Sequence, residues 1–280
     1  MKVLSIQMQS TTGQVAANYE RAFSLLELSA RLYRPEVILL PEAFAAYMAG
    51  PDMRQFGEDV PGPNADRFCQ YSQRYQAMIM FGLIRKNPRG DGIYNSVVIV
   101  DKGQILGIYD KTHLTMNLRP EDRALKNEQE IFLPGDRLGL FDTRFGRIGV
   151  LICHDGDYPE VWRCLALEGA RAVFHLSETS VDVGAWARLH ALWNTTPVFT
   201  CNLLKRDQHG AKIGGRSVFA DIRGNLLDAA GTAESFLYAD VNLDEQDSFR
   251  AGGLHPWANY FRVRRPDLYG ALTRPKQESL

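Results

Sequence analysis

The chain has 280 residues, of which 45% are hydrophobic and 23% are charged, and its formal net charge is −1. This balance is typical of a globular protein and contains no long run of one sign, so neither a nucleic acid nor an anionic membrane is an expected partner. The apolar start, Met1–Met8, is too short for a signal peptide, and no segment is long enough to span a bilayer. We therefore expect a cytoplasmic protein.

Short apolar runs rich in Val, Ile and Leu predict buried strands, and amphipathic segments between them predict helices. The expected strands, in chain order, are Val3–Gln7, Val37–Leu40, Ala77–Ile84, Ser96–Val100, Ile105–Tyr109, Arg147–Ile152, Ala172–Leu176, Val198–Asn202, Ser217–Asp221 and Phe236–Val241. The expected helices are Asn18–Tyr33, Ala65–Tyr75, Pro159–Leu167 and Gly184–Trp193. Glycine-containing turns at Pro88–Gly92, Asp101–Gln104 and Ile222–Asn225 predict hairpins.

The combination of helical crossovers and hairpins indicates mixed sheets. An α/β fold of two such sheets, packed face to face and covered by helices on their outer sides as an α-β-β-α sandwich, accommodates all of these elements. No repeat, low-complexity tract or linker divides the sequence, so we expect one domain over residues 1–280. Its last part, Ala251–Leu280, is less regular and is expected to pack on a partner subunit.

The four cysteines are Cys69, Cys153, Cys164 and Cys201. Their spacings match no zinc pattern, and a cytosolic protein keeps its thiols reduced, so disulfides, metals and other cofactors are not expected. Cys69 and Cys164 lie in helical patterns and Cys201 lies inside an apolar strand, which predicts that all three are core residues. Cys153 differs, because it stands at the junction between a strand and a turn.

Three reactive side chains, Glu42, Lys111 and Cys153, each follow the end of an apolar strand. The carboxyl ends of strands are where open sheets place their ligand sites, so these side chains are expected to share one pocket. Each has a simpler interpretation. A strand cysteine is usually a small core residue, and a lysine at a strand end usually lies on the surface. Glu42 weakens these interpretations, because a carboxylate in a buried region must be paired or have a raised pKa.

Three segments carry a resemblance to a known family: Leu39–Glu42, Tyr109–Leu114 and Gly149–Asp155. In their order and separation they resemble the three signature segments of the nitrilase superfamily, the carbon–nitrogen hydrolases, over roughly residues 1–270. Three ordered motifs are far more specific than one alone. The resemblance implies an α-β-β-α sandwich that usually dimerises through its helical layers, so a homodimer or larger homo-oligomer is expected.

The resemblance also implies a second glutamate between the lysine and the cysteine. Glu128 has the matching distance from the Pro-Gly pair that follows it, and Glu121 and Glu130 are nearby competitors. This second glutamate would orient Lys111 and the substrate nitrogen.

The chemistry implied is covalent hydrolysis. Glu42 would take the thiol proton of Cys153, because the thiolate is the nucleophile. The Lys111 ammonium and the backbone N–H of His154 would hold the oxyanion that forms when an amide carbonyl is attacked. Glu42 would then protonate the departing ammonia and activate water to release the acid from a thioester.

Two other hydrolase types are disfavoured. A papain-like dyad would need His113, His154 or His175 beside the thiol, but His154 directly follows Cys153 and would point to the opposite face if the strand stays extended. The segment Gly215–Phe219 lacks the second glycine of a serine nucleophile elbow.

The expected substrate is a small carboxamide, because the turn Asp155–Arg163 looks most like that of the short-chain aliphatic amidases. N-carbamoyl compounds come second, with Arg188 or Arg216 as candidates to hold a carboxylate. Nitriles come third, and a non-catalytic binding protein is the alternative from another class. Tyr47 and Glu178 are candidate pocket walls.

Overall fold

The computed structural model describes residues 1–46, 53–116, 127–206, 212–250 and 261–274. Tyr47 and Glu121 lie outside the described residues. So do residues 251–260 and 275–280 of the predicted tail.

The first sheet has six strands in the order β14-β1-β2-β3-β4-β5. Their bounds are β1 Lys2–Gln7, β2 Val37–Leu39, β3 Met78–Lys86, β4 Ile93–Asp101, β5 Gln104–Asp110 and β14 Ser235–Asp240. The strands β1, β2 and β3 are parallel to one another, and the remaining pairs are antiparallel. The sheet is therefore mixed, as expected from its combination of crossovers and hairpins.

The second sheet also has six strands, in the order β13-β12-β9-β8-β7-β6. Their bounds are β6 Gly139–Thr143, β7 Gly146–Ile152, β8 Val173–Ser177, β9 Val198–Asn202, β12 Val218–Ala220 and β13 Leu226–Ala229. Parallel pairing joins β7, β8 and β9, and the outer pairs are antiparallel. A separate hairpin joins β10 (Leu204–Arg206) to β11 (Lys212–Gly214).

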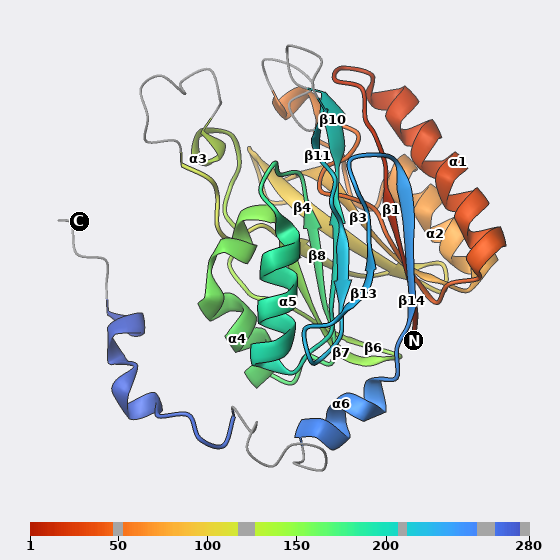
Figure 1. Cartoon of the computed structure of the whole chain (residues 1–280). Coiled ribbons are helices and arrows are strands. Elements are labelled where there is room, and N and C mark those ends of the chain that lie inside the picture. The colour runs from red at the N-terminus through yellow and green to blue at the C-terminus, as the bar shows by residue number, and fades with distance from the viewer. Residues whose placement is uncertain (47–52, 117–126, 207–211, 251–260, 275–280) are drawn as a thin grey trace.

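Helices cover the outer side of each sheet (Figure 1). The helices α1 (Val15–Tyr33) and α2 (Pro63–Tyr75) pack on the first sheet, and α4 (Pro159–Leu167) and α5 (Val183–Asn194) pack on the second. Two further helices, α3 (Glu128–Ile131) and α6 (Leu243–Arg250), and the 3-10 turns Met53–Phe56, Cys153–Asp157, Pro266–Leu268 and Gly270–Thr273 complete the described elements.

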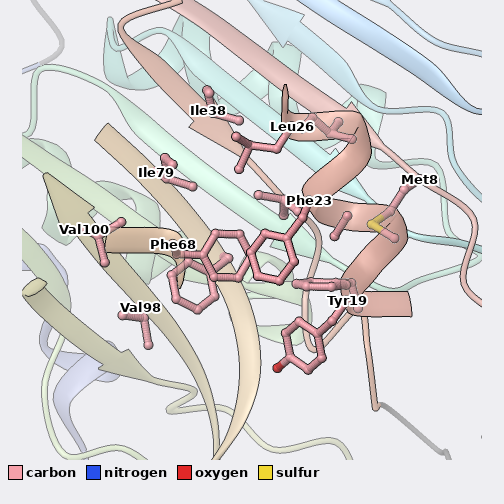
Figure 2. Packing of buried hydrophobic residues seen from close by; sticks show 14 of the residues in the cluster. Met8, Tyr19, Phe23, Leu26, Ile38, Phe68, Ile79, Val98 and Val100 are labelled. Carbon is pink, nitrogen blue, oxygen red and sulfur yellow. The ribbon is translucent and has the colours of Figure 1, made fainter. Parts of the chain in front are cut away.

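Three apolar clusters hold the layers together, because each removes hydrocarbon surface from water. One lies between the two sheets and draws residues such as Val37 and Phe174 from both. Another lies between the first sheet and its helices and includes Phe23 and Phe68 (Figure 2). In it the rings of Phe68 and Phe81 stack with centroids 3.8 Å apart. The third lies between the second sheet and α4 and α5. The predicted α-β-β-α sandwich is thus confirmed.

Some elements of the structure were not predicted from the apolar patterns of the sequence. The strands β6 and β13 and the helix α6 were not predicted, because none carries a clear apolar repeat; β13 has three of its four residues exposed at a sheet edge. The predicted hairpins are present. At one of them Lys102 and Gly103 have φ values of 51° and 83°, which a two-residue turn between strands favours.

The cysteines only partly follow the prediction. Cys201 is buried in the core and Cys69 is half-buried, but Cys164 is exposed, so its assignment to the core was wrong. The reason is that α4 buries only one face, which carries Trp162 and Leu165, and Cys164 lies on the other.

Candidate active site

The ends of two strands and a short helix bring three of the predicted site residues into one cluster. Glu42 lies in the turn after β2, Lys111 follows β5, and Glu128 comes from α3. The side chains of Glu42 and Lys111 are each 1% exposed and that of Glu128 is 2% exposed. Lys111 Nζ donates to Glu42 Oε1 at 3.1 Å and to the two carboxylate oxygens of Glu128 at 2.9 and 2.8 Å. One ammonium is thus held between two buried carboxylates.

The identity of the second glutamate follows from this geometry. Glu128 is in the first turn of α3 and accepts the backbone N–H of Thr115 at 2.8 Å besides the Lys111 ammonium. Glu130 is exposed, and Glu121 lies outside the described residues. Of the two described competitors, Glu128 is therefore the one that contacts Lys111.

The two oxygens of Glu42 are in different situations. Oε1 accepts the Nδ2 amide of Asn95 at 2.7 Å as well as the Lys111 ammonium. Oε2 is buried and has no hydrogen-bond partner among the described residues. A carboxylate held by one oxygen with the other unoccupied can accept a proton from a neighbouring group.

Asn95 was missed by the sequence reasoning. It is fully buried in β4, and its backbone carbonyl accepts the backbone N–H of Lys111 at 2.9 Å. One residue therefore positions both Glu42 and Lys111. The signal in the sequence was a polar residue inside an apolar strand, which must find partners when buried.

The charges in the cluster perturb one another's pKa values. Burial raises the pKa of Glu42, and the Lys111 ammonium only partly opposes this. Burial acts in the same direction on Glu128, but the ammonium and its hydrogen bonds outweigh it and lower the pKa of that carboxyl. Burial alone would lower the pKa of Lys111, but the surrounding carboxylates and thiol raise it well above its usual value. Lys111 is therefore a permanent cation, and Glu42 is the more basic carboxylate.

Cys153 begins the 3-10 turn that follows β7, and its φ of 44° lies in the left-handed region. Its thiol is 4.0 Å from the carbonyl oxygen of Glu178. Burial, with a contribution from the Glu42 charge, raises the pKa of this thiol well above its usual value, although Lys111 opposes the shift. The resting residue is a thiol, so it needs a base before it can act as a nucleophile.

Asp155 holds the cysteine turn against the strand that precedes Lys111. Its buried carboxylate accepts the N–H of Ile152 at 3.0 Å, the hydroxyl of Tyr109 at 2.8 Å and the N–H of His113 at 2.9 Å. Burial opposes ionisation, but these hydrogen bonds outweigh it and lower the pKa of Asp155. The ends of β5 and β7 are thus tied together by one anion.

The histidines do not form a dyad with the thiol in the described part of the chain. His113 contacts Asp155, and His175 Nε2 lies 2.9 Å from the carbonyl oxygen, not the sulfur, of Cys153. The argument that an extended strand would point His154 away from the thiol does not apply, because β7 ends at Ile152 and His154 lies in the 3-10 turn. The His154 ring instead lies 2.5 Å from Asp157 in the 3-10 turn.

The remaining candidate residues have separate positions. Glu178 lies at the end of β8 beside the cysteine, and its carboxylate, 5% exposed, forms an ion pair with Lys205. Arg188 donates to the carbonyl of Gly224 at 3.0 Å, and Arg216 is exposed.

The described residues contain no group of three His, Cys, Asp or Glu side chains suited to a metal ion. None of the helices among them is long and apolar enough to cross a bilayer.

The α-β-β-α sandwich, the buried Glu42–Lys111–Glu128 cluster and a half-buried cysteine thiol on which its charges act fit a hydrolase of the nitrilase superfamily. Residues 2–251 match the family model described as carbon–nitrogen hydrolase, and the chain belongs to this family.

Relatives with known names cover most of the chain. The omega-amidase of Saccharomyces cerevisiae is 27% identical over 263 residues, which cover 89% of this chain and 90% of that protein. The N-carbamoylputrescine amidase of Solanum lycopersicum is 36% identical over 200 residues, which cover 64% of this chain and 63% of that protein. Among solved structures, a carbon–nitrogen hydrolase from Helicobacter pylori G27 has a TM-score of 0.84 at 24% identity and 99% coverage of both chains. This last likeness shows the fold.

Proposed function

We propose that the protein is an amidase that hydrolyses a small carboxamide to an acid and ammonia through a thioester on Cys153. The observation that carries the proposal is the state of Glu42, whose Oε1 is held by Asn95 and Lys111 and whose buried Oε2 has no partner in the described part of the chain. A fixed base with one available oxygen, close enough for its charge to raise the pKa of a buried thiol, is suited to remove the thiol proton.

The reaction divides into two halves. Glu42 accepts the proton of Cys153 as the sulfur attacks the amide carbon, and the carbonyl electron pair moves to oxygen. The C–N bond then breaks, Glu42 returns the proton to the leaving nitrogen, and ammonia departs from a thioester. Water adds to the thioester by the same steps, and the acid leaves as the thiol is restored.

Two donors would stabilise the oxyanion. Lys111 is a permanent cation, held by Glu128 so that its position does not depend on the substrate. The backbone N–H of His154 belongs to the first residues of the 3-10 turn, whose N–H groups have no acceptor within that turn. Removal of one oxyanion donor typically lowers the rate by about 10²–10³.

The relatives support an amide as substrate, since they include omega-amidases and N-carbamoylputrescine amidases. An N-carbamoyl compound is the second candidate. Glu178 favours it, because a buried carboxyl beside the cysteine could pair with a substrate ammonium if Lys205 moved aside. Arg188 does not favour it, because its guanidinium is engaged with the Gly224 carbonyl.

The test is ammonia release from a panel of small carboxamides, N-carbamoyl amines and amino acids, and nitriles. We expect carboxamides to be hydrolysed fastest and Cys153→Ala to be inactive. Cys164→Ser is the matched control, because it changes an exposed cysteine away from the cluster and should leave the rate unchanged. Persistent hydrolysis by Cys153→Ala would overturn the assignment of the nucleophile.

We also propose that the protein is a homo-oligomer. The outer helical layer over the second sheet exposes Leu167 on α4 and Leu189 and Trp193 on α5, each between 42% and 45% exposed. A second copy would remove this apolar surface from water. Light scattering behind size-exclusion chromatography should give at least twice the mass of one chain; a monomer at micromolar concentration would contradict this proposal.

A further inference from the structure

The backbone at Cys153 is held in an unfavourable conformation. Its φ of 44° places a residue with a side chain in the left-handed region, which is unfavourable for residues other than glycine. Such a conformation persists only where its surroundings enforce it. Asp155 provides one restraint, by accepting the Ile152 N–H just before the turn. The peptide group just after Cys153 needs another.

His175 contacts that peptide group. It lies on β8, in register with Leu151 of β7, and is 1% exposed. Its Nε2 lies 2.9 Å from the carbonyl oxygen of Cys153 and 3.0 Å from the hydroxyl of Ser177. The mechanism proposed above makes no use of this buried side chain.

The chemistry of the contact defines the tautomer of His175. A carbonyl oxygen only accepts, so Nε2 must carry the hydrogen. The other ring nitrogen, Nδ1, is buried and has no partner among the described residues, so a second proton there would be unsatisfied. In agreement, burial lowers the pKa of His175. His175 is therefore a neutral donor and is not suited to shuttle protons.

The peptide between Cys153 and His154 links this contact to the proposed oxyanion donor. In a planar trans peptide the C=O and N–H bonds point in opposite directions. A hydrogen bond from His175 to the carbonyl oxygen therefore sets the direction of the His154 N–H on the other side of the same plane. Without it, the peptide could rotate and the N–H would turn away from the position of the oxyanion.

We infer that His175 is a positioning residue, which orients the His154 N–H toward the oxyanion through its hydrogen bond to the Cys153 carbonyl. The inference rests on the proposed function, because it presupposes attack by Cys153 on a carbonyl carbon. The alternative is a purely structural histidine that only fills the space between β8 and the helices, where its ring is 5.6 Å from that of Trp162.

The variants His175→Gln and His175→Met separate these two roles. Glutamine and methionine have similar length and volume, but only glutamine can keep an N–H near the position of Nε2. The control is His190→Met, which alters a histidine of α5 whose ring stacks on that of Trp162 with centroids 4.6 Å apart, without touching the Cys153 carbonyl.

Two reactions of the thiol serve as readouts that do not require amide turnover. Propanal adds to Cys153: the sulfur bonds to the aldehyde carbon, the carbonyl electron pair moves to oxygen, and the thiol proton passes to that oxygen through Glu42. Iodoethane alkylates the same sulfur by displacing iodide, and because it has no carbonyl group, no oxyanion forms. Mass spectrometry of the Cys153 peptide measures alkylation, and protection by propanal gives the dissociation constant of the aldehyde adduct.

We expect His175→Met to weaken propanal binding and to lower kcat by about tenfold or more, since loss of a whole oxyanion donor costs about 10²–10³. His175→Gln and His190→Met should stay within about threefold of the unmodified protein. The alkylation rate should be equal in all of them. Equal propanal binding by the Gln and Met variants would overturn the inference. So would a fall in alkylation that matches the fall in propanal binding, because His175 would then act on the thiol and not on the oxyanion.

If His175→Met does not fold, His175→Asn replaces it, because asparagine keeps the amide but is too short to reach the carbonyl. Equal propanal binding by the Gln and Asn variants would again overturn the inference. Failure of the proposed function has a different signature. In that case the unmodified protein itself neither binds propanal nor is alkylated at Cys153, and this result would overturn both proposals.

Discussion

Cys153 and Cys201 are two thiols of the second sheet with different surroundings: Cys153 directly follows β7, and Cys201 lies within β9. Cys201 lies inside β9, in the apolar layer between the sheets, and burial raises the pKa of its thiol to about 12. The pKa of the Cys153 thiol is also raised well above its usual value. A depressed thiol pKa therefore does not distinguish the two. The difference is that the charges of a carboxylate with an available oxygen and of a fixed cation act on the Cys153 thiol. The Cys201 thiol instead interacts with the backbone carbonyls of Ile6 and Leu39 and with the side chain of Ser5.

Substitution of Glu42, the carboxylate that distinguishes the surroundings of Cys153 from those of Cys201, should have the largest effect on activity. We expect Glu42→Gln to lower kcat by about 10²–10⁴, because it removes the proton acceptor while the amide preserves the shape of the side chain. Steady-state hydrolysis of the best carboxamide measures this effect. Cys201→Ala is the control and should leave kcat unchanged. A Glu42→Gln variant with more than a tenth of the original rate would show that the base is another group.

Substitution of Lys111, the cation of the cluster, should have the next largest effect on activity. Lys111→Met is expected to lower kcat by about 10²–10³, because the oxyanion loses one donor. It also leaves two buried carboxylates without their shared partner, so we expect the free energy of unfolding to fall by about 3–5 kcal/mol. Rate and urea denaturation should be measured together. Lys86→Met, which changes an exposed lysine paired with Asp59, should alter neither.

Glu178, whose backbone carbonyl lies beside the Cys153 thiol, should make the free energy of unfolding depend on pH. Burial raises the pKa of Glu178 to about 7, although Lys205 opposes the shift. In the unfolded chain this carboxyl ionises near pH 4.3, so between about pH 4.3 and 7 only the folded protein keeps the proton. The free energy of unfolding should therefore fall by up to about 4 kcal/mol as pH rises through this window.

Glu178→Gln should remove that part of the pH dependence. The measurement is the difference in unfolding free energy between this variant and the unmodified protein from pH 4 to 8. If the unfolding free energies of the two proteins changed with pH in parallel, the raised pKa of Glu178 would be refuted.

The smallest expected effect concerns Asn95. We expect Asn95→Ala to lower kcat by about tenfold, because Glu42 loses the amide that fixes its Oε1 and a misplaced catalytic group is less effective. Asn87→Ala, in the exposed turn between β3 and β4, is the matched control. If Asn95→Ala kept full activity, the Lys111 ammonium alone would be sufficient to orient Glu42.

Much of the architecture could be predicted because it depends on local patterns. The helices α4 and α5 could be predicted from local start and stop signals, Pro159 and Gly169 for α4 and Pro197 beyond α5, and their boundaries agree with the structure to within one residue. Glu42, Lys111 and Cys153 could be singled out because each follows the end of an apolar run. The edge strand β13 could not, since an exposed strand carries no alternation of apolar residues.

What the sequence determined by itself was the order of strands and helices and the reactive residues at three strand ends, because periodicity and strand boundaries are local properties. Only the tertiary structure decided which groups meet there. Asn95 contacts Glu42 across 53 positions of the chain, and His175 contacts the Cys153 carbonyl across 22. These partners depend on which strands lie side by side and on which face each residue points to. Sheet order and register set both, and neither is written in a single stretch of sequence.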